Sequence, residues 1–274
     1  MMNITFRFAQ QANARRCLLA NIRLLLLGAI FCSSYAGAQP EVSNPTSPPA
    51  RTAESLIDEM EALYQGQSSR AEIRMEVVTP QYQRAMTLVS LSQARVNTLI
   101  RILTPKKERG ISTLKLDQEM WNYFPKINKV IKIPPSMMMG SWMGSDFTND
   151  DLVKQTTLTE EYFLELEETA GQYRIILKPR AQTVTVWGQI DYVIDREHLV
   201  PVSQTFYDDR GVAVRKLTFS DLTDFDGRLL PARLEMIPLN KSGHKTVVVY
   251  ESLSFNPPEI TDDVFSLRNL KSRF

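Results

Sequence analysis

The chain has 274 residues, of which 43% are hydrophobic and 23% are charged, and its formal net charge is +1. This composition is that of a globular protein and excludes a disordered or collagen-like chain. The first 38 residues hold four arginines and no acid, so residues 39–274 carry 28 basic and 31 acidic groups. A net charge of −3 there lacks the basic surface of a nucleic-acid-binding domain, and no nucleic-acid partner is expected.

The N-terminus has the pattern of a cleavable export signal. A basic region precedes a short apolar core, residues 24–31, and the small residues Ala36-Gly37-Ala38 follow. The alternative is a retained membrane anchor, but the core is much shorter than the roughly 20 apolar residues of a spanning helix. We therefore expect residues 1–38 to be a signal peptide that is cleaved after Ala38.

The rest of the chain is expected to form a linker and one domain. Both cysteines, Cys17 and Cys32, lie in the signal segment, so the mature chain would have no disulfide, thiolate metal site or cysteine nucleophile. Residues 39–51 are rich in Pro, Ser and Thr, which predicts a disordered linker. Residues 52–274 have a suitable length for a single β-rich domain.

An amphipathic helix is predicted at the start of this domain, over residues 52–65. Apolar residues recur at helical spacing from Leu56 to Tyr64, Thr52 is a candidate N-cap, and Gly66 stands where a glycine would end the helix.

After this helix the hydrophobic period changes from 3.6 to 2, and residues 70–77 alternate between apolar and charged side chains. Further strand-like runs follow at 85–91, 96–103, 112–116, 120–124, 129–133, 162–167, 173–177, 183–194, 202–207, 212–219, 232–236 and 246–255. Turn signals separate several of them, at 208–211, 226–227 and 241–243. Short strands at this spacing predict an antiparallel meander that is closed or partly closed.

Catalytic and metal-binding motifs are missing from the sequence. His198 and His244 stand in separate segments, and neither has a second ligand at metal-binding spacing. No Gly-rich phosphate loop, nucleophile elbow or paired zinc-binding motif occurs. We therefore expect no enzymatic activity, no catalytic residue, no metal and no cofactor.

Residues 133–152 follow neither period and are rich in methionine. Methionine is flexible and polarizable, so it adapts to ligands of varied shape. The candidate lining of an apolar cleft or lid is Met137, Met138, Met139, Trp142 and Met143, with Gly140 and Gly144 as candidate hinges. The alternative, which the sequence leaves equally open, is a loop that folds back onto the core.

A short aromatic strand precedes this segment. Trp121 and Phe124 stand on it and are expected to line the same apolar cleft. Lys126, Lys129 and Lys132 surround the strand and are interpreted as a solvated rim. A cationic rim on an apolar cleft would also suit an anionic lipid head group.

These features, in this order, resemble LolA, the periplasmic lipoprotein carrier of Gram-negative bacteria, and its LolA-like relatives. The most specific stretches are Arg-Ile-Leu-Thr-Pro-Lys-Lys-Glu-Arg-Gly at 101–110, Asp-Gln-Glu-Met-Trp-Asn-Tyr-Phe-Pro at 117–125, and the methionine-rich segment followed by Asp-Phe-Thr-Asn-Asp-Asp-Leu at 146–152. The resemblance covers residues 52–274. It is to the subgroup described as outer-membrane lipoprotein-sorting proteins.

The resemblance implies a mainly β fold with a few helices: an incomplete antiparallel β-barrel, or half-barrel, wrapped over helices as in LolA and LppX. It also implies a monomeric periplasmic carrier without a cofactor, whose apolar cleft shields the acyl chains of a lipoprotein or lipid between the inner and outer membranes. Its partners would be an inner-membrane transporter of the RND or ABC type and an outer-membrane acceptor.

An outer-membrane β-barrel is the alternative function class. Strand-like runs behind an export signal and the terminal Phe274 fit it. Several strands, however, carry charges on both faces, as at residues 212–216. A charge that faces lipid costs ~2–4 kcal/mol at the middle of the bilayer, which argues against this class.

Overall fold

The computed structural model describes residues 51–64, 66–94, 96–153 and 158–272. The fold described below lies within the compact unit Pro49–Phe274. The predicted signal peptide and the linker up to residue 50 lie outside the described residues. No helix within the described ranges is long and apolar enough to cross a membrane.

Helix α1 (Ala53–Ala62) opens the fold with a capping box. The Ser55 backbone N–H donates to Thr52 Oγ1 at 3.2 Å, and the Thr52 N–H donates to Ser55 Oγ at 3.1 Å. These bonds satisfy backbone donors that the first turn of a helix leaves without partners. After the helix, Gly66 has a left-handed φ of +54°, and its N–H donates to the Ala62 carbonyl at 3.3 Å. The predicted N-cap is confirmed, whereas the helix ends at Ala62, earlier than the predicted end before Gly66.

The described residues form thirteen strands in one antiparallel sheet. The strands are β1 (Ser68–Val78), β2 (Gln83–Gln93), β3 (Asn97–Thr104), β4 (Ser112–Leu116), β5 (Glu119–Phe124), β6 (Lys129–Lys132), β7 (Tyr162–Glu168), β8 (Gln172–Pro179), β9 (Gln189–Asp195), β10 (Pro201–Tyr207), β11 (Ala213–Phe225), β12 (Arg228–Pro238) and β13 (Lys245–Phe255). Their order is β6-β5-β4-β3-β2-β1-β13-β12-β11-β10-β9-β8-β7, so β6 and β7 are free edges. The predicted mainly β fold with an incomplete antiparallel barrel is confirmed.

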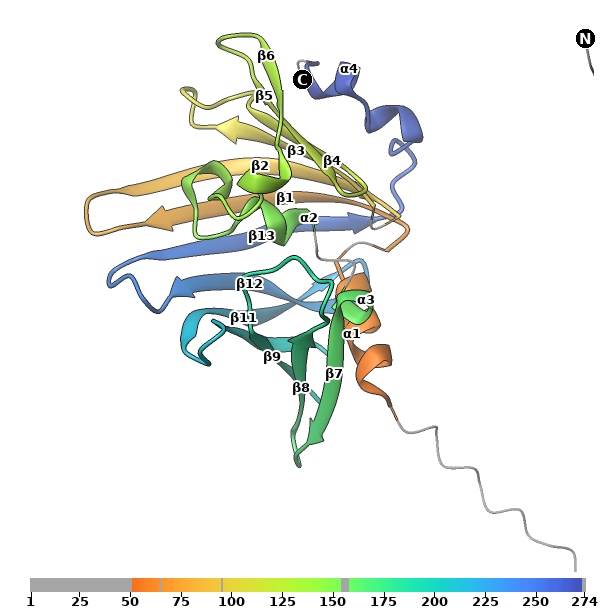
Figure 1. Cartoon of the computed structure of the whole chain (residues 1–274). Helices are drawn as coiled ribbons and strands as arrows, with labels where there is room; N and C mark the ends of the chain where they lie inside the picture. Colours follow the sequence, from red (N-terminus) through yellow and green to blue (C-terminus); the bar gives the residue numbers. More distant parts are fainter. Residues whose placement is uncertain (1–50, 65, 95, 154–157, 273–274) are drawn as a thin grey trace, which may run out of the picture. The chain divides into compact units, whose positions relative to one another are not determined.

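This order means that the chain must cross the sheet once. From β1 in the middle, β2 to β6 lead to one edge; the chain then passes to β7 at the opposite edge and returns through β8 to β13, which pairs with β1. Figure 1 shows the green segment with α2 (Asn149–Val153) in front of the sheet and α3 (Leu158–Glu161) beside α1. Residues 133–153 of this connection, with the short helices η1 (Pro135–Met137), η2 (Trp142–Gly144) and α2, are called the cover segment.

The sheet is covered on both faces. The inner face packs against α1, whose Leu56 and Ile57 are fully buried, and against Trp142 of the cover segment. On the outer face, Leu99 and Leu114 of β3 and β4 pack against the C-terminal segment, which holds η3 (Asp262–Val264) and α4 (Leu267–Leu270). Each strand in this part therefore has one side toward the interior of the fold and another toward the C-terminal segment.

One predicted strand is shorter than expected. The alternation over 183–194 predicts a strand from Thr183, but β9 begins only at Gln189. The Thr183 N–H donates to the Arg180 carbonyl at 3.0 Å and closes a turn, and Val184 is 86% exposed. The alternation of residues 183–188 therefore has no sheet to pack on, and this stretch is a loop.

Candidate ligand-binding cavity

A cavity of about 280 Å³ lies between the inner face of the sheet and the segments that cover it. The sheet wall on the β1–β5 side includes Ala71, Ile73, Met75, Leu88, Ile100 and Met120, and the wall on the β9–β13 side includes Ile190, Tyr192, Phe206, Leu217, Leu234, Met236, Val248 and Tyr250. The covering side includes Met60 of α1, Tyr64 shortly after α1, Trp142, Phe147, Leu152 and Trp187. A concave, mainly apolar space with a few polar groups is typical of small-molecule sites.

Small side chains make room for this cavity in the middle of the inner face. Ala71 of β1 stands directly opposite Ser90 of β2, and both line the cavity. On one side along the same strands follow the larger Ile73 and Leu88, which also stand opposite one another. Because side chains alternate between the faces of a strand, the period-2 pattern places this small pair and its larger neighbours on one face.

Trp142 closes part of the cavity from the cover segment. Its side chain is buried, and its indole Nε1–H donates to Thr113 Oγ1 at 3.1 Å. The Thr113 hydroxyl in turn donates to Asn122 Oδ1 at 2.7 Å. A buried indole N–H needs such a partner, so this chain of hydrogen bonds fixes the ring against β4 and β5.

Two further contacts attach the cover segment to the sheet. The Asp146 N–H donates to Thr246 Oγ1 of β13 at 2.9 Å, and the Thr246 hydroxyl donates to the Asp146 carboxylate at 2.7 Å. Arg84 of β2 donates to the Met143 carbonyl and forms an ion pair with Glu108 at 3.2 Å. The segment is therefore held from both sides of the β1–β13 junction.

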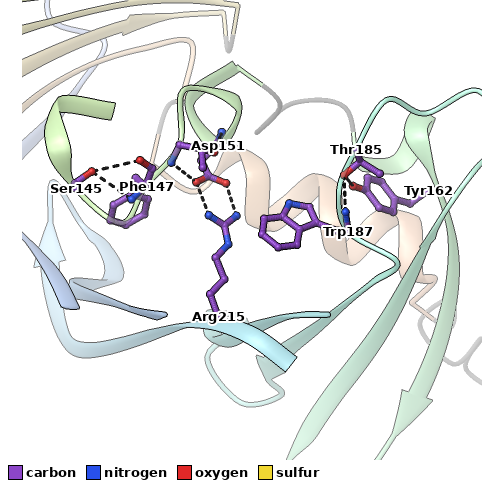
Figure 2. Close-up of polar contacts among 8 residues, drawn as sticks. Ser145, Phe147, Asp151, Tyr162, Thr185, Trp187 and Arg215 are labelled. Atoms are coloured by element: carbon purple, nitrogen blue, oxygen red, sulfur yellow. Dashed lines mark hydrogen bonds and ion pairs between the residues drawn. The ribbon is translucent and has the colours of Figure 1, made fainter. Parts of the chain in front are cut away.

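The closest ion pair at the cavity joins the cover segment to β11. Arg215 donates to Asp151 through both terminal nitrogens, Nη1 to Oδ2 at 2.8 Å and Nη2 to Oδ1 at 2.6 Å (Figure 2). The side chains are 6% and 16% exposed. Asp151 also accepts from the Thr148 N–H at 2.7 Å, and the Asp151 N–H donates to the Thr148 hydroxyl at 3.2 Å, which is a capping box at the start of α2.

Aromatic rings of the cavity wall complete the surroundings of this ion pair. The guanidinium carbon of Arg215 lies 4.3 Å from the ring centroid of Trp187 and 4.1 Å from that of Phe206. Figure 2 shows Trp187 beside the Arg215–Asp151 pair. A cation over desolvated aromatic faces is stabilised by the ring quadrupoles. The arrangement therefore couples the cover segment, β11 and two cavity-lining rings.

Three cavity-lining tyrosines show how strongly this region excludes water. The Tyr64 and Tyr250 rings stack with centroids 5.1 Å apart, and the Tyr64 hydroxyl donates to the Pro231 carbonyl at 2.9 Å. Burial raises the pKa of Tyr64, and the neighbouring Tyr250 and Tyr192 raise it further. Burial also raises the pKa of Tyr192 and raises that of Tyr250 to about 12. The phenolate form is disfavoured here because the wall offers little solvation for a charge.

The residues predicted for an apolar cleft lie in several places. Trp142 lines the cavity. Met138 packs against the small inner cluster of Met120 and Ile133, and Met143 packs on the inner-face core beside Trp142. Met137 is 56% exposed.

The other residues predicted for the cleft are not among those that line the cavity. Met139 and Phe124 are partly buried. Trp121 packs on the outer face with the C-terminal segment, and the Lys132 ammonium lies 5.4 Å from its ring centroid. Gly144 has a φ of +71°, and a Cβ at Gly140 would approach the Met137 carbonyl to 3.0 Å. The role of these residues in ligand binding stays a prediction.

Several residues of the cavity, and Arg215 beside it, were not found from the sequence. Lys115, whose side chain is buried, and Arg215 stand on strands and read as ordinary exposed charges. Tyr64 belongs to the predicted amphipathic helix, and Trp187 falls in the predicted strand 183–194. The only signal for them was their presence in apolar runs, which does not distinguish a cavity wall from a filled core.

Within the described ranges, no group of three or more His, Cys, Asp or Glu side chains is placed to hold a metal ion. His198 is 40% exposed, and its Nδ1 lies 3.0 Å from Asp195 Oδ1 in a turn. Asp195 also accepts from the His198 N–H, and this contact, followed in importance by the bond to the ring, lowers the pKa of the Asp195 carboxyl. This pair lies in the turn between β9 and β10, neither residue lines the cavity, and the pair has the character of a turn contact.

Comparison with known proteins identifies the fold. A LolA superfamily protein from Nitrosomonas europaea matches with a TM-score of 0.66 and 18% identity, over 80% of this chain and 100% of its own. An outer membrane lipoprotein-sorting protein domain from Vibrio parahaemolyticus matches with a TM-score of 0.68 and 22% identity. The match covers 81% of this chain and 100% of that domain. A DUF1329 family protein from Desulfovibrio piger matches with a TM-score of 0.69 and 21% identity. The match covers 80% of this chain and 97% of that protein.

No protein with a curated description matches the chain. A family model, described only as that of an uncharacterised protein, matches residues 94–272. This range includes most of the sheet, the cover segment and the C-terminal segment. The chain therefore belongs to the family of this model, and its fold is LolA-like.

Proposed function

We propose that the protein is a periplasmic carrier that shields the acyl chains of a lipid or lipoprotein in this cavity during transfer between the inner and outer membranes. The observation that carries the proposal is the cavity itself, an apolar space of about 280 Å³ between an open sheet and its covering segments. Each methylene removed from water contributes about 0.8 kcal/mol, so an acyl chain gains affinity along its whole length.

The relatives support a carrier more than an enzyme. One of the similar structures is described as an outer membrane lipoprotein-sorting domain, which fits a protein that moves lipid-modified cargo. The Asp151–Arg215 pair beside the cavity attaches the cover segment to β11, and its two charges are engaged with one another. The proposed partners are an inner-membrane transporter of the RND or ABC type and an outer-membrane acceptor, with the carrier acting as a monomer.

The cover segment is the proposed moving part. It is attached by side-chain contacts to β2, β4, β11 and β13, and these can open without breaking the sheet. Gly140 and Gly144 are the proposed hinges, because Gly144 has a left-handed φ and adjoins Met143 with a φ of +49°. Trp142, which lies between them and lines the cavity, would move with the segment.

The outer-membrane barrel is a weaker alternative. The sheet ends in the free edges β6 and β7, whereas a membrane-spanning barrel closes its edges so that every backbone group is paired. Its inner face is also occupied by α1 and the cover segment.

A matched pair of variants on one strand tests the carrier proposal. Ala71→Phe places a ring into the cavity from β1, and Glu72→Phe places the same ring on the other face of β1, where the side chain is exposed. Binding is measured with a naturally fluorescent polyene fatty acid, and thermal unfolding is measured alongside. We expect Ala71→Phe to weaken probe binding at least tenfold and Glu72→Phe to bind as the unchanged protein does.

A second variant protects this test against misfolding. Ser90→Phe adds the ring from β2, at the position directly opposite Ala71. If either folded cavity variant binds the probe as tightly as the Glu72→Phe control, the ligand does not occupy this cavity. If the unchanged protein binds no acyl probe and carries no lipid when purified from the periplasm, the carrier proposal is wrong.

A further inference from the structure

Four polar side chains stand side by side across the inner face of the sheet. The strand register pairs Ser69 of β1 with Ser92 of β2, Ser92 with Thr98 of β3, and Thr98 with Lys115 of β4. All four line the cavity. Because neighbouring strands lie about 4.8 Å apart, three hydroxyls and one ammonium form a continuous row, which is called the polar row.

Three residues of the polar row are buried and Thr98 is half-buried, and among the described residues the three hydroxyls have no protein partner. Ser69 is 4% exposed and Ser92 is 8% exposed. Within the described ranges of the chain, no hydrogen bond joins the hydroxyl of Ser69, Ser92 or Thr98 to another protein group. These hydroxyls line the cavity, so they can form hydrogen bonds with a polar group that enters it.

Lys115 adds a positive charge to the row. Its side chain is 4% exposed, and it has an interaction of its own in the fold. An ammonium has three N–H donors and can serve more than one acceptor. The acidic residues at the cavity, Glu61, Asp150 and Asp151, come from the covering side rather than from the sheet, and Asp151 is paired with Arg215.

The rest of the sheet wall has the opposite character. On the β9–β13 side the lining includes Ile190, Phe206, Leu217, Leu234, Met236 and Val248. Gln204 and two tyrosines are the polar exceptions among the described strands of this side. The cavity therefore has a hydroxyl-rich and cationic end under β1–β4 and an apolar end under β9–β13, which is the polarity of an amphiphile.

We propose, on the basis of the carrier function above, that the polar row is a head-group subsite inside the cavity. It binds the anionic oxygen head group of a single-chain amphiphile, with the acyl chain against the β9–β13 wall. The hydroxyls donate to the oxygens of the head group, and Lys115 supplies the opposite charge, which makes these hydrogen bonds shorter and stronger than neutral ones. A fatty-acid carboxylate and a lysophospholipid phosphate share this chemistry.

The test measures head-group preference separately from chain binding. A neutral fluorescent probe, 1-N-phenylnaphthylamine, is bound to the full mature protein and displaced by oleate, by lysophosphatidate with the same chain, or by methyl oleate. We expect at least one of the two anions to displace the probe at a concentration about tenfold or more below that of the uncharged ester. The more effective anion identifies the head group.

Variants of the row should remove this preference. Thr98→Val keeps the shape of the side chain without its hydroxyl. Ser92→Ala removes a second hydroxyl of the row, and Lys115→Met removes its positive charge. Each should raise the concentration of anion needed by about threefold to tenfold, with little change for methyl oleate and with thermal unfolding close to that of the unchanged protein. Lys216→Met, which removes an exposed lysine from β11, is the matched control and should keep the preference.

The outcomes separate the two proposals. Equal displacement by the anions and the ester, or a preference that survives in all three folded variants, overturns the head-group subsite and leaves the carrier proposal standing. If no acyl compound displaces the probe, the carrier proposal fails and the subsite fails with it.

Discussion

The Asp151–Arg215 pair offers the sharpest test of how the cover segment is held. Asp151→Ala removes two hydrogen bonds to the guanidinium, at 2.6 and 2.8 Å, and leaves Arg215 with a side chain only 6% exposed. Removing one partner of a buried ion pair costs about 3–5 kcal/mol, because the remaining charge loses its compensation. For a domain of this size, each kcal/mol lowers the melting temperature by about 2–4 °C, so a fall of roughly 10 °C is expected.

The size of the loss should depend on what remains at each end. Asp151→Asn keeps an oxygen that can accept from the Thr148 N–H and should cost less than Asp151→Ala. The double variant Asp151→Ala/Arg215→Met leaves no uncompensated charge and should be more stable than Asp151→Ala alone, although it has one more substitution. Urea titrations give the free energies of unfolding. The unchanged protein, Asp151→Ala, Arg215→Met and the double variant form a double-mutant cycle, and Asp151→Asn is measured beside it.

The same variants also test whether the stability of the cover segment affects the rate of ligand dissociation. A loosened cover segment should release the fluorescent fatty acid faster, so dissociation rates of the single variants should exceed that of the unchanged protein. If the losses of Asp151→Ala and Arg215→Met simply add in the double variant, or if Asp151→Ala costs less than about 1 kcal/mol, the pair does not hold the cover segment on β11.

The remaining predictions concern the walls of the cavity. Leu56→Ala in α1 should lower the free energy of unfolding by about 2–5 kcal/mol in urea titrations, because the side chain is fully buried and leaves a void. Gly188→Ala should lower the melting temperature, because a Cβ there would lie 2.6 Å from the Asp208 carbonyl oxygen; Gly171→Ala, with open space around it, is the control. Tyr250 has a pKa of about 12 in the fold, against about 10 in an unfolded chain, so its contribution to stability is complete below pH 10 and is lost as the pH rises from about 10 to 12. Free energies of unfolding measured between pH 9 and pH 12 should fall less steeply for Tyr250→Phe, and an unchanged slope would contradict the buried environment of this phenol.

Much of the fold could be predicted from local signals. The capping residue Thr52 marked the start of α1, and Asp226-Gly227 marked the hairpin between β11 and β12, where both residues have positive φ. Such signals act within a few residues, so they can be read from the sequence. The pairing of β1 with β13 has no local signal, because it joins residues as far apart as Ser69 and Phe255. The LolA-like resemblance, rather than the pattern, indicated an incomplete barrel.

The cavity was harder to predict than the sheet. Alternation in β4 gives Thr113 and Lys115 to one face and Leu114 and Leu116 to the other, but the C-terminal segment buries the second face as well. A period of 2 therefore could not show which face was the cavity wall. The methionine-rich segment was correctly placed outside the regular strands, and Trp142 within it lines the cavity. The partners of the segment, such as Arg215, lie too far along the chain for spacing to reveal them.

The meeting of the first and last strands at the centre of the sheet has a consequence for how the molecule forms. Strands β1–β6 and β7–β13 are each a run of neighbours in sequence, and each half can assemble through contacts of short range. The β1–β13 junction must wait for the last strand, since it closes a loop of more than a hundred residues at a high entropic cost. The cavity takes its walls from both halves, so neither half alone possesses it. A ligand that contacts both walls would therefore bind only the completed fold, and a nascent or truncated chain would lack its binding site.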